Sequence, residues 1–349
     1  MKKMILSAGV VLFLIAGTIP SANAQKVFQS ALIGFYNQEN LFDTVNDPKI
    51  NDEEFLPDGI NHWNTAKYMR KLQHMSEAIS KIGLSVNPDG VAVLGISEIE
   101  NRKVIEDLIS MPALKDRHYQ IVHYNSPDRR GVDVALLYNP KYLKVLATKS
   151  TRLYVKGMPN FRTRDQLLVE GSLLGEKIYF IVNHWPSRYG GEKRSRPLRD
   201  AAAALSRHIS DSLMAINPKA KIIVMGDLND NPNNESVLKI MKAVGSEKQM
   251  KGSDFFNPMY KLYKSGNGTT AWRDTWSLFD QILLSPGLMG KNYSTWEYYK
   301  VEVFNKQFLV QKEGRYKGYP YRSFAGGAWM GGYSDHFPVY VVLIRELRK

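Results

Sequence analysis

An α+β fold is the class that the sequence predicts, on three observations. Short apolar runs rich in β-branched residues recur from residue 27 to residue 344, at the length of buried strands. Residues 65–83 carry apolar side chains at helical spacing, and 198–216 form an alanine-rich helical stretch. No Pro/Gly/Ser linker and no internal repeat divides the chain, which is 44% hydrophobic and long enough to bury a large core. We therefore expect one domain over residues 25–349.

The first half of the chain supplies six expected strands and two expected helices. The strands are residues 27–36, 90–96, 119–123, 132–138, 143–147 and 167–173, and the helices are 65–83 and 104–111. In the first helix Ala66, Met69, Leu72, Met75, Ile79 and Ile82 form one apolar face, and Gly83 is expected to cap its end. Residues 50–64, with Pro57, Asp58 and Gly59, read as a polar loop.

The second half supplies five expected strands and two more helices. The strands are residues 178–182, 222–225, 277–285, 296–304 and 339–344, and the helices are 198–216 and 237–244. We expect 296–304 to be an exposed or edge strand. Two stretches, 245–275 and 308–330, are polar or rich in glycine and aromatic residues and are expected as long loops.

Residues 1–24 have the pattern of a cleaved signal peptide. Lys2 and Lys3 precede an apolar stretch at 5–19, and Ser21-Ala22-Asn23-Ala24 is a small-residue cleavage site. An uncleaved anchor is the alternative, but the apolar stretch is short for a membrane span of about 20 residues. We expect a secreted or periplasmic protein without stable membrane insertion. With Cys 0 it has no disulfide and no cysteine for a lipid anchor.

The chain is strongly basic. Its formal net charge is +13, and removing the two lysines of the signal segment leaves 13 − 2 = +11. A basic surface suits nucleic acid, anionic lipid or a phosphorylated small molecule. The alternative is a basic isoelectric point without any such partner.

The stretch around Asp227 organises the chemistry. The apolar run 222–225 stops at Gly226, and Asp227, Asn229 and Asp230 follow at once. Carboxylate and carboxamide groups at the end of a buried strand are suited to hold hard divalent cations and phosphates. An Asx-rich turn is the alternative interpretation.

Four other strand ends carry similar groups: Asn37, Glu98, His184, and the pair Asp335 and His336. If the strands share a sandwich, these ends converge on one rim. Oxygen ligands without cysteine favour Mg²⁺, Mn²⁺ or Ca²⁺, and two histidines can transfer protons or contact phosphate. Asp280 lies inside an expected strand, where its propensity is unfavourable, so it needs a partner.

These motifs together resemble the endonuclease/exonuclease/phosphatase superfamily. The resemblance rests on FYNQENLFD, SE after VAVLGI, NHWPSR, GDLN, the Asp of LFDQILLS, and GGYSDHFPV, in the family's order from about residue 27 to 345. The chain is similar to exonuclease III and pancreatic-type deoxyribonuclease, and NHWPSR, the Gly/Arg loop after it and GGYSDHFPV resemble exported bacterial members. It implies a four-layer α/β/β/α sandwich of two mostly antiparallel sheets, and phosphate ester hydrolysis by water that uses a divalent metal, Mg²⁺ first and Mn²⁺ or Ca²⁺ as alternatives.

The resemblance also implies a role for each matching residue. The metal-side residues are Asn37, Glu98 and Asp335, and the catalytic residues are His184, Asp227, Asn229, Asp280 and His336. Among these, Asp227 matches the carboxylate that activates water, His184 the acid for the leaving oxygen, and Asp280 the partner of His336. Tyr138 resembles a phosphate-contacting tyrosine. Ser97 departs from the family, which has Gln at this position.

Three classes of function compete. The first is a secreted nuclease for DNA or RNA, in which Tyr138, Arg164, Arg188, Arg196 and Arg199 bind substrate. The second is a phosphatase or phosphodiesterase for a phospholipid headgroup or inositol phosphate. The third is a non-catalytic binding module, which the full set of acids and histidines disfavours. The loop 308–330 can serve as a base-stacking platform, a membrane surface or a folded lid. We expect a monomer.

Overall fold

The structure, a computed structural model, describes residues 26–347 and contains two packed β-sheets. The predicted signal peptide lies outside the described residues. One sheet has six strands in the order β14 (Glu297–Val303), β17 (Val339–Glu346), β1 (Phe28–Leu41), β2 (Val93–Ile99), β4 (Asp133–Tyr138), β3 (Gln120–His123). The other has seven in the order β5 (Leu143–Thr151), β6 (Gln166–Leu173), β7 (Glu176–His184), β8 (Ile222–Asp227), β13 (Asp280–Leu284), β10 (Phe255–Phe256), β9 (Ala243–Val244).

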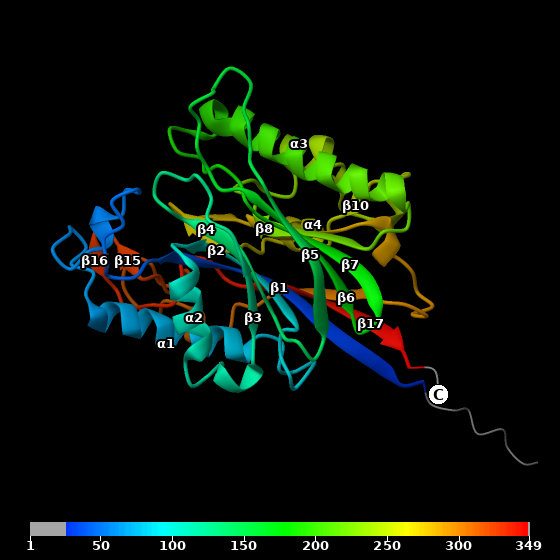
Figure 1. Cartoon of the computed structure of the whole chain (residues 1–349), viewed down its shortest axis with the longest axis horizontal. Helices are drawn as coiled ribbons and strands as arrows, with labels where there is room; N and C mark the ends of the chain where they lie inside the picture. Colours follow the sequence, from blue (N-terminus) through cyan, green and yellow to red (C-terminus); the bar gives the residue numbers. More distant parts are fainter. Residues whose placement is uncertain (1–25, 348–349) are drawn as a thin grey trace, which may run out of the picture.

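Helices cover the outer face of each sheet. Figure 1 shows α1 (Thr65–Lys81) and α2 (Arg102–Ser110) beside the six-stranded sheet and α3 (Glu192–Ile216) across the seven-stranded sheet. Apolar residues of α3 pack with those of β7, β8 and β13 in one core, and a larger core fills the space between the sheets and under α1. The predicted four-layer sandwich is therefore confirmed.

Strand direction places the polar strand ends together. Most neighbouring strands are antiparallel, but β1 pairs parallel with β2 and β7 pairs parallel with β8. The carboxyl ends of each parallel pair therefore meet at one edge of their sheet. Antiparallel β13 begins at the same edge, because Asp280 is in register with Asp227. One rim of the sandwich thus collects the ends of strands that are distant in sequence.

The two sheets approach closely behind this rim. Gly95 on β2 faces Met225 on β8 and Val182 on β7, and a Cβ at Gly95 would lie 3.0 Å from the sulfur of Met225. That spacing is tighter than ordinary van der Waals contact, so a larger residue here would push the sheets apart. The rim at the ends of these strands is therefore supported by a close-packed core.

Several expected boundaries differ from those observed. β1 and β2 each run past the expected end, through Asn37 to Leu41 and through Glu98 to Ile99. The helix expected at 237–244 is only a π-helical turn, Ser236–Ile240, followed by β9. The strand expected at 277–285 divides into β12 (Thr275–Ser277) and β13.

Helix boundaries differ as well. α3 begins at Glu192, six residues before the expected start, and Pro197 lies inside the helix, where it removes one intrahelical hydrogen bond without ending the helix. Ala66 and Met69 are exposed on α1, and Tyr68, Lys71 and Ala78 are buried instead. The buried face of α1 is therefore rotated from the expected one.

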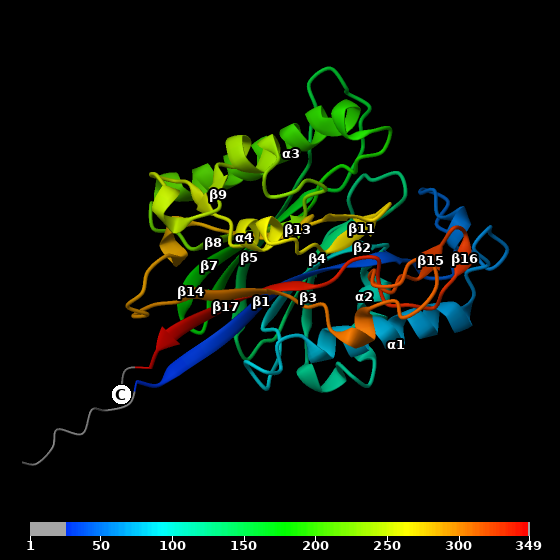
Figure 2. The same cartoon turned by 180° about the vertical axis from the view of Figure 1, so that it is seen from behind.

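The long loops contain small elements. Residues 245–275 include α4 (Met259–Lys264) and β11 (Thr270–Trp272), which pairs with β12. Residues 308–330 include the hairpin of β15 (Phe324–Ala325) and β16 (Ala328–Trp329). Figure 2 shows β11 and this hairpin toward the same end of the molecule. The expected edge strand is β14, which borders the six-stranded sheet. Over residues 26–347 no helix combines the length and apolarity that a bilayer crossing requires.

Candidate active site

One carboxylate oxygen, Oδ2 of Asp227, lies at the centre of the rim. It accepts a hydrogen bond from Asn37 Nδ2 at 3.1 Å. It lies 3.7 Å from His184 Nε2 and 3.9 Å from His336 Nε2. Side chains from β1, from the ends of β7 and β8, and from the loop before β17 therefore meet at one oxygen, and the sequence predicted that these residues would lie together.

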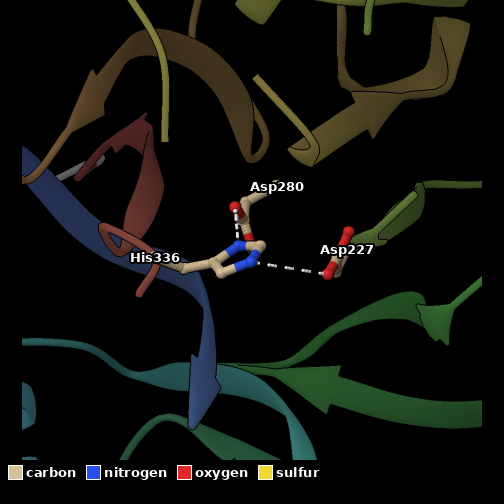
Figure 3. A group of neighbouring side chains, drawn as sticks. All are labelled: Asp227, Asp280 and His336. Carbon is tan, nitrogen blue, oxygen red and sulfur yellow. Dashed lines mark hydrogen bonds and ion pairs between the residues drawn. The ribbon is translucent and has the colours of Figure 1, made fainter. Parts of the chain in front are cut away.

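Asp280 and His336 form a buried pair beside Asp227. Nδ1 of His336 is 2.7 Å from Oδ2 of Asp280, and Figure 3 shows the imidazole between the two aspartates. Burial opposes the charged imidazolium, but the carboxylates of Asp280, Asp335 and Asp227 together outweigh it and raise the pKa of His336 well above its ordinary value. The partner that Asp280 needs within a strand is therefore His336, and the pair presents a charged Nε2 to the rim.

Matching bulges in β1 and β2 turn Glu98 toward the rim. The register between these strands shifts between Asn37 and Leu41, and Glu39, Asn40 and Glu98 all have positive φ angles of 49°, 53° and 57°. Such conformations cost free energy for residues other than glycine and often mark functional sites. The Asn40 backbone amide donates to Oε2 of Glu98 at 3.0 Å. The bulges thus fix this carboxylate at the site.

Asp227 is held by its own loop. The Asn229 amide donates to Oδ1 of Asp227 at 2.9 Å, and Asn229 Nδ2 donates to the carbonyl of Trp185 at 2.9 Å. A Cβ at Gly226 would collide with the backbone carbonyl of Asn183 on β7, so only glycine fits before Asp227. Burial raises the pKa of Asp227 to about 7, against the opposing effect of His336.

His184 ends β7 in a different environment. Its Nε2 is 3.7 Å from Oε1 of Glu98, the same distance as from Asp227. Burial lowers the pKa of His184 well below its ordinary value, and the cations Arg164, Arg130 and His336 act in the same direction. A neutral imidazole cannot act as the proton donor that the resemblance implies, so His184 is better suited to donate a hydrogen bond or bind a metal.

The rim fits a divalent metal ion. Ligand atoms of Asp227, Asp280 and His336 lie within 4.8 Å of one another, although His336 could bind an ion only after it loses its proton. The predicted metal-side set surrounds this group: Asn37 bonds to Asp227, Glu98 faces His184, and Oδ1 of Asp335 is 3.9 Å from His336 Nε2. All donors are carboxylate or amide oxygens and imidazole nitrogens, which suit hard or borderline cations.

The predicted substrate-binding arginines are engaged within the protein. Buried Arg164 donates to the carbonyls of His184 and Trp185 and pairs with Asp128 at 3.0 Å. Buried Arg199 pairs with Asp230 at 2.8 Å. These two guanidiniums are enclosed by protein, so we correct their predicted role: they support the rim and do not meet a substrate.

The other two predicted arginines also have acidic partners. Arg188 pairs with Glu192 at 2.7 Å and with Asp230 at 3.1 Å. Exposed Arg196 pairs with Asp200 and Glu235. Their charges are therefore largely compensated, and the basic loop after His184 offers less positive charge than its composition suggests.

Tyr138 is not at the site, which corrects its predicted phosphate contact. It is in register with Val93, at the start of β2, whereas Asp133 at the other end of β4 is in register with Ile99. Because β4 runs antiparallel to β2, the end of β4 lies away from the end of β2. Five residues of strand, roughly 16 Å, separate Tyr138 from the rim.

Sequence reasoning did not assign a role to Glu39 or Lys71, which lie next to the site. Lys71 Nζ is 3.5 Å from Glu39 Oε2 and donates to Ser323 Oγ and the Tyr333 carbonyl, both at 2.6 Å. A lysine three residues after Tyr68 and four before Met75 shares their buried face of α1, and this spacing was the available signal.

Comparisons with known proteins agree with the geometry. A sequence model of the Endonuclease/Exonuclease/phosphatase family matches residues 32–345. No curated protein matches the sequence.

Several solved structures share the fold. An endonuclease/exonuclease/phosphatase family protein from Bacteroides thetaiotaomicron is 17% identical, with a TM-score of 0.56 over 92% of this chain and 100% of that one. A mannosyl-6-phosphatase from the same organism is 16% identical, with a TM-score of 0.54 over 90% and 99%. TDP2 from D. rerio, complexed with a single-strand DNA product, is 13% identical, with a TM-score of 0.52 over 90% and 98%. At these identities the similarity establishes the fold.

Proposed function

This chain belongs to the Endonuclease/Exonuclease/phosphatase family of phosphoric ester hydrolases, and from that premise we propose that it is a secreted or periplasmic, divalent-metal-dependent nuclease. The observation that carries the chemistry is the convergence of Asp227, Asp280 and His336 at one rim. The nucleic-acid substrate is supported by the strongly basic composition: the formal net charge is +13, or 13 − 2 = +11 without the signal segment.

Two residues of the rim have separate roles in the proposed hydrolysis. Asp227 can accept the proton of an attacking water, because burial holds its pKa at about 7, near the operating pH. Charged His336 presents Nε2 to a phosphoryl oxygen, where it stabilises the negative charge of the transition state. A divalent ion, when bound, supplies further charge neutralisation and lowers the pKa of bound water.

Other groups orient these two. Asp280 fixes the ring of His336 and keeps it charged. Asn37 and the Asn229 amide each bond one oxygen of Asp227, which fixes the direction in which that carboxylate accepts a proton. Glu98 and Asp335, with 16% and 32% of their side chains exposed, are accessible carboxylates at the edge of this cluster and are proposed to hold the ion, Mg²⁺ first and Mn²⁺ or Ca²⁺ as alternatives.

A substrate panel tests this function. Purified protein beginning at residue 25 is given single- and double-stranded DNA, RNA, sphingomyelin, inositol phosphates and a sugar phosphate, with Mg²⁺ or with excess chelator. We expect nucleic-acid cleavage that requires the metal and is abolished in Asp227→Asn. Robust turnover of a lipid, inositol phosphate or sugar phosphate without nucleic-acid cleavage would establish the phosphatase alternative. Undiminished hydrolysis in chelator would remove the metal requirement.

Export is a separate part of the proposal. It is supported by the charged start, apolar stretch and small-residue site of residues 1–24. Mass spectrometry of the native protein should find Gln25 at the amino terminus in the secreted or periplasmic fraction. A terminus at Met1 in the membrane fraction would contradict cleavage.

A further inference from the structure

A basic and aromatic groove lies next to the catalytic rim. It encloses about 370 Å³ and is lined by Trp272, Arg273, Arg315, Tyr316, Tyr319 and Arg322, with Ala271, Asp274 and Gly326. We propose that this Arg–aromatic groove binds a single-stranded segment of nucleic acid beside the phosphate that is cleaved. The inference rests on the proposed nuclease function and names the form of its substrate.

The charges of the groove are available to a ligand. Within residues 26–347, Arg273, Arg315 and Arg322 form no ion pair, in contrast to the arginines of the basic loop after His184. The one acid of the groove, Asp274, accepts a hydrogen bond from the Tyr319 hydroxyl at 2.6 Å. Nε of Arg322 is buried and has no hydrogen-bond partner in the part of the chain that the structure describes. Three guanidiniums against one carboxylate leave the groove with a net positive charge, which favours a ligand with several phosphates.

Aromatic rings accompany these charges. Arg315 and Arg322 lie 5.9 and 5.5 Å from the ring centre of Tyr316, and Arg273 lies 5.6 Å from that of Trp272. The Trp272 side chain is 71% exposed, which is unusual for a large aromatic residue without a partner. Trp272 is exposed and Tyr316 is half-buried, and rings of this kind beside cations are a surface on which unpaired bases stack while their phosphates are neutralised.

Both walls of the groove connect directly to catalytic residues. The β11–β12 hairpin carries Trp272 and leads within three residues to Asp280. On the other wall, Arg322 accepts a backbone hydrogen bond from Gly332, four residues before His336. Trp276 joins the walls, since it stacks on Phe337 at 6.1 Å and lies 5.9 Å from Tyr319. A single strand of nucleic acid bound in the groove would therefore lie next to Asp280 and His336.

The groove is held in place by the buried pair on α1 and β1. Glu39 accepts the amide of Ser323 at 2.6 Å, and Lys71 binds the Ser323 hydroxyl, directly after Arg322. The hairpin that follows packs inward, because Phe324 and Trp329 contact buried Trp63. These rings are thus not presented to a membrane, and the loop is a folded wall that needs little reorganisation to bind.

Binding measurements test the groove separately from catalysis. We expect a fluorescent oligothymidylate of about twelve nucleotides, titrated in chelator, to bind the mature protein. Arg315→Gln and Trp272→Ala should each weaken this binding roughly 5- to 100-fold. Arg315→Gln should also reduce the salt slope by about 0.7, the loss of one phosphate contact on a single strand. Each variant needs an unfolding midpoint close to that of the wild type.

Two control variants match these changes away from the groove. Lys144→Gln removes one charge from an exposed position at the end of β5 away from the rim. Tyr299→Ala removes a 56% exposed ring from β14. Both should bind the oligonucleotide like the wild type, so that equal losses in controls and groove variants would show a general charge effect and overturn the groove.

The outcomes separate the two proposals. Wild-type cleavage of nucleic acid, with unchanged binding by the groove variants, overturns the groove and leaves the nuclease standing. Oligonucleotide binding through the groove, with only phosphomonoesters hydrolysed, supports the groove and overturns the nuclease. Trp272-dependent binding to anionic phosphatidylglycerol vesicles without oligonucleotide binding would assign the groove to a lipid surface instead.

Discussion

The two histidines of the rim, His184 and His336, occupy similar positions but opposite electrostatic states. Each is buried and each places Nε2 within 4 Å of the Asp227 carboxylate. His336 has Asp280 at hydrogen-bond distance on its other nitrogen and is charged. By contrast, Nδ1 of His184 is buried without a partner among the described residues, and the His184 ring is neutral. The role of each imidazole is therefore set by the partner of its Nδ1 atom more than by the distance of its Nε2 atom from Asp227.

Removal of the charged histidine should have the largest effect. Asp280→Asn and His336→Ala should each lower kcat about 10²- to 10⁴-fold, since the imidazolium is the group that meets the developing charge. The double variant should lose little more, because both changes remove one functional unit. Initial rates on a nucleic-acid substrate measure this, and fully multiplicative losses would show that the two residues act separately.

The neutral histidine should matter less to proton transfer. His184→Gln keeps a hydrogen-bond donor near Glu98 and Asp227, so we expect a loss of about tenfold, with the pH profile of kcat/KM unchanged in shape. His184→Ala serves as the comparison without a donor. A loss as large as that of His336→Ala, with a missing alkaline limb, would mean that His184 carries a catalytic proton after all.

The ion pair behind His184 should affect stability more than chemistry. Arg164→Met leaves buried Asp128 with only the more distant guanidinium of Arg130, at 3.9 Å, and releases two backbone carbonyls, so the free energy of unfolding should fall by about 3 kcal/mol. The double variant Arg164→Met/Asp128→Asn should recover part of that loss. Denaturant midpoints report both effects, and an unchanged Arg164→Met midpoint would show that the pair does not support the rim.

The smallest expected effect is on the pH dependence of the free energy of unfolding, to which the two histidines should contribute in opposite directions. For His336 the folded pKa is raised, so its stabilisation is complete below about pH 6.5 and declines as pH rises through the folded value. For His184 the folded pKa is lowered, so its stabilisation is complete above about pH 6.5 and declines as pH falls.

Metal-free protein unfolded in urea from pH 4 to pH 9 reveals these slopes. In a plot of the free energy of unfolding against pH, His336→Gln should reduce the decline at alkaline pH and His184→Gln the decline at acidic pH. Each histidine contributes about 1.4 kcal/mol for every pH unit by which folding moves its pKa. Asp227, with its pKa raised to about 7, adds a decline up to pH 7 in both variants, so Asp227→Asn is the control background. The same slope in both histidine variants would remove the distinction between the rings.

Much of the site could be predicted because a carboxylate directly after a buried apolar run is visible in the sequence. Asp227 and Glu98 are predicted in this way, His336 by its place just before the closing strand, and Asp280 by its poor strand propensity. The fold class followed from the same runs. The four-layer arrangement could be predicted only from the family resemblance, because no single apolar stretch of sequence specifies the order of the strands in a sheet.

The failures concern partners that come from distant segments. Arg199 is neutralised by Asp230, which follows β8, and Arg196 by Glu235, so neither pairing is visible near the arginines themselves. Tyr138 was misplaced because the direction of β4 is set by its pairing with β2. The bulges that turn Glu98 have no sequence signal, since Glu39, Asn40 and Glu98 are not glycines.

The pairing of β1 with β17 has a practical consequence. Phe28 is in register with Glu346, so both ends of the described chain emerge side by side, as Figure 1 also shows. Nine residues of β1 separate Phe28 from Asn37, which places these ends roughly 30 Å from the rim. A tether at either end would therefore attach the protein at the edge opposite the candidate active site. Protein immobilised in this way would keep that site open to polymers that are too large to diffuse into a matrix.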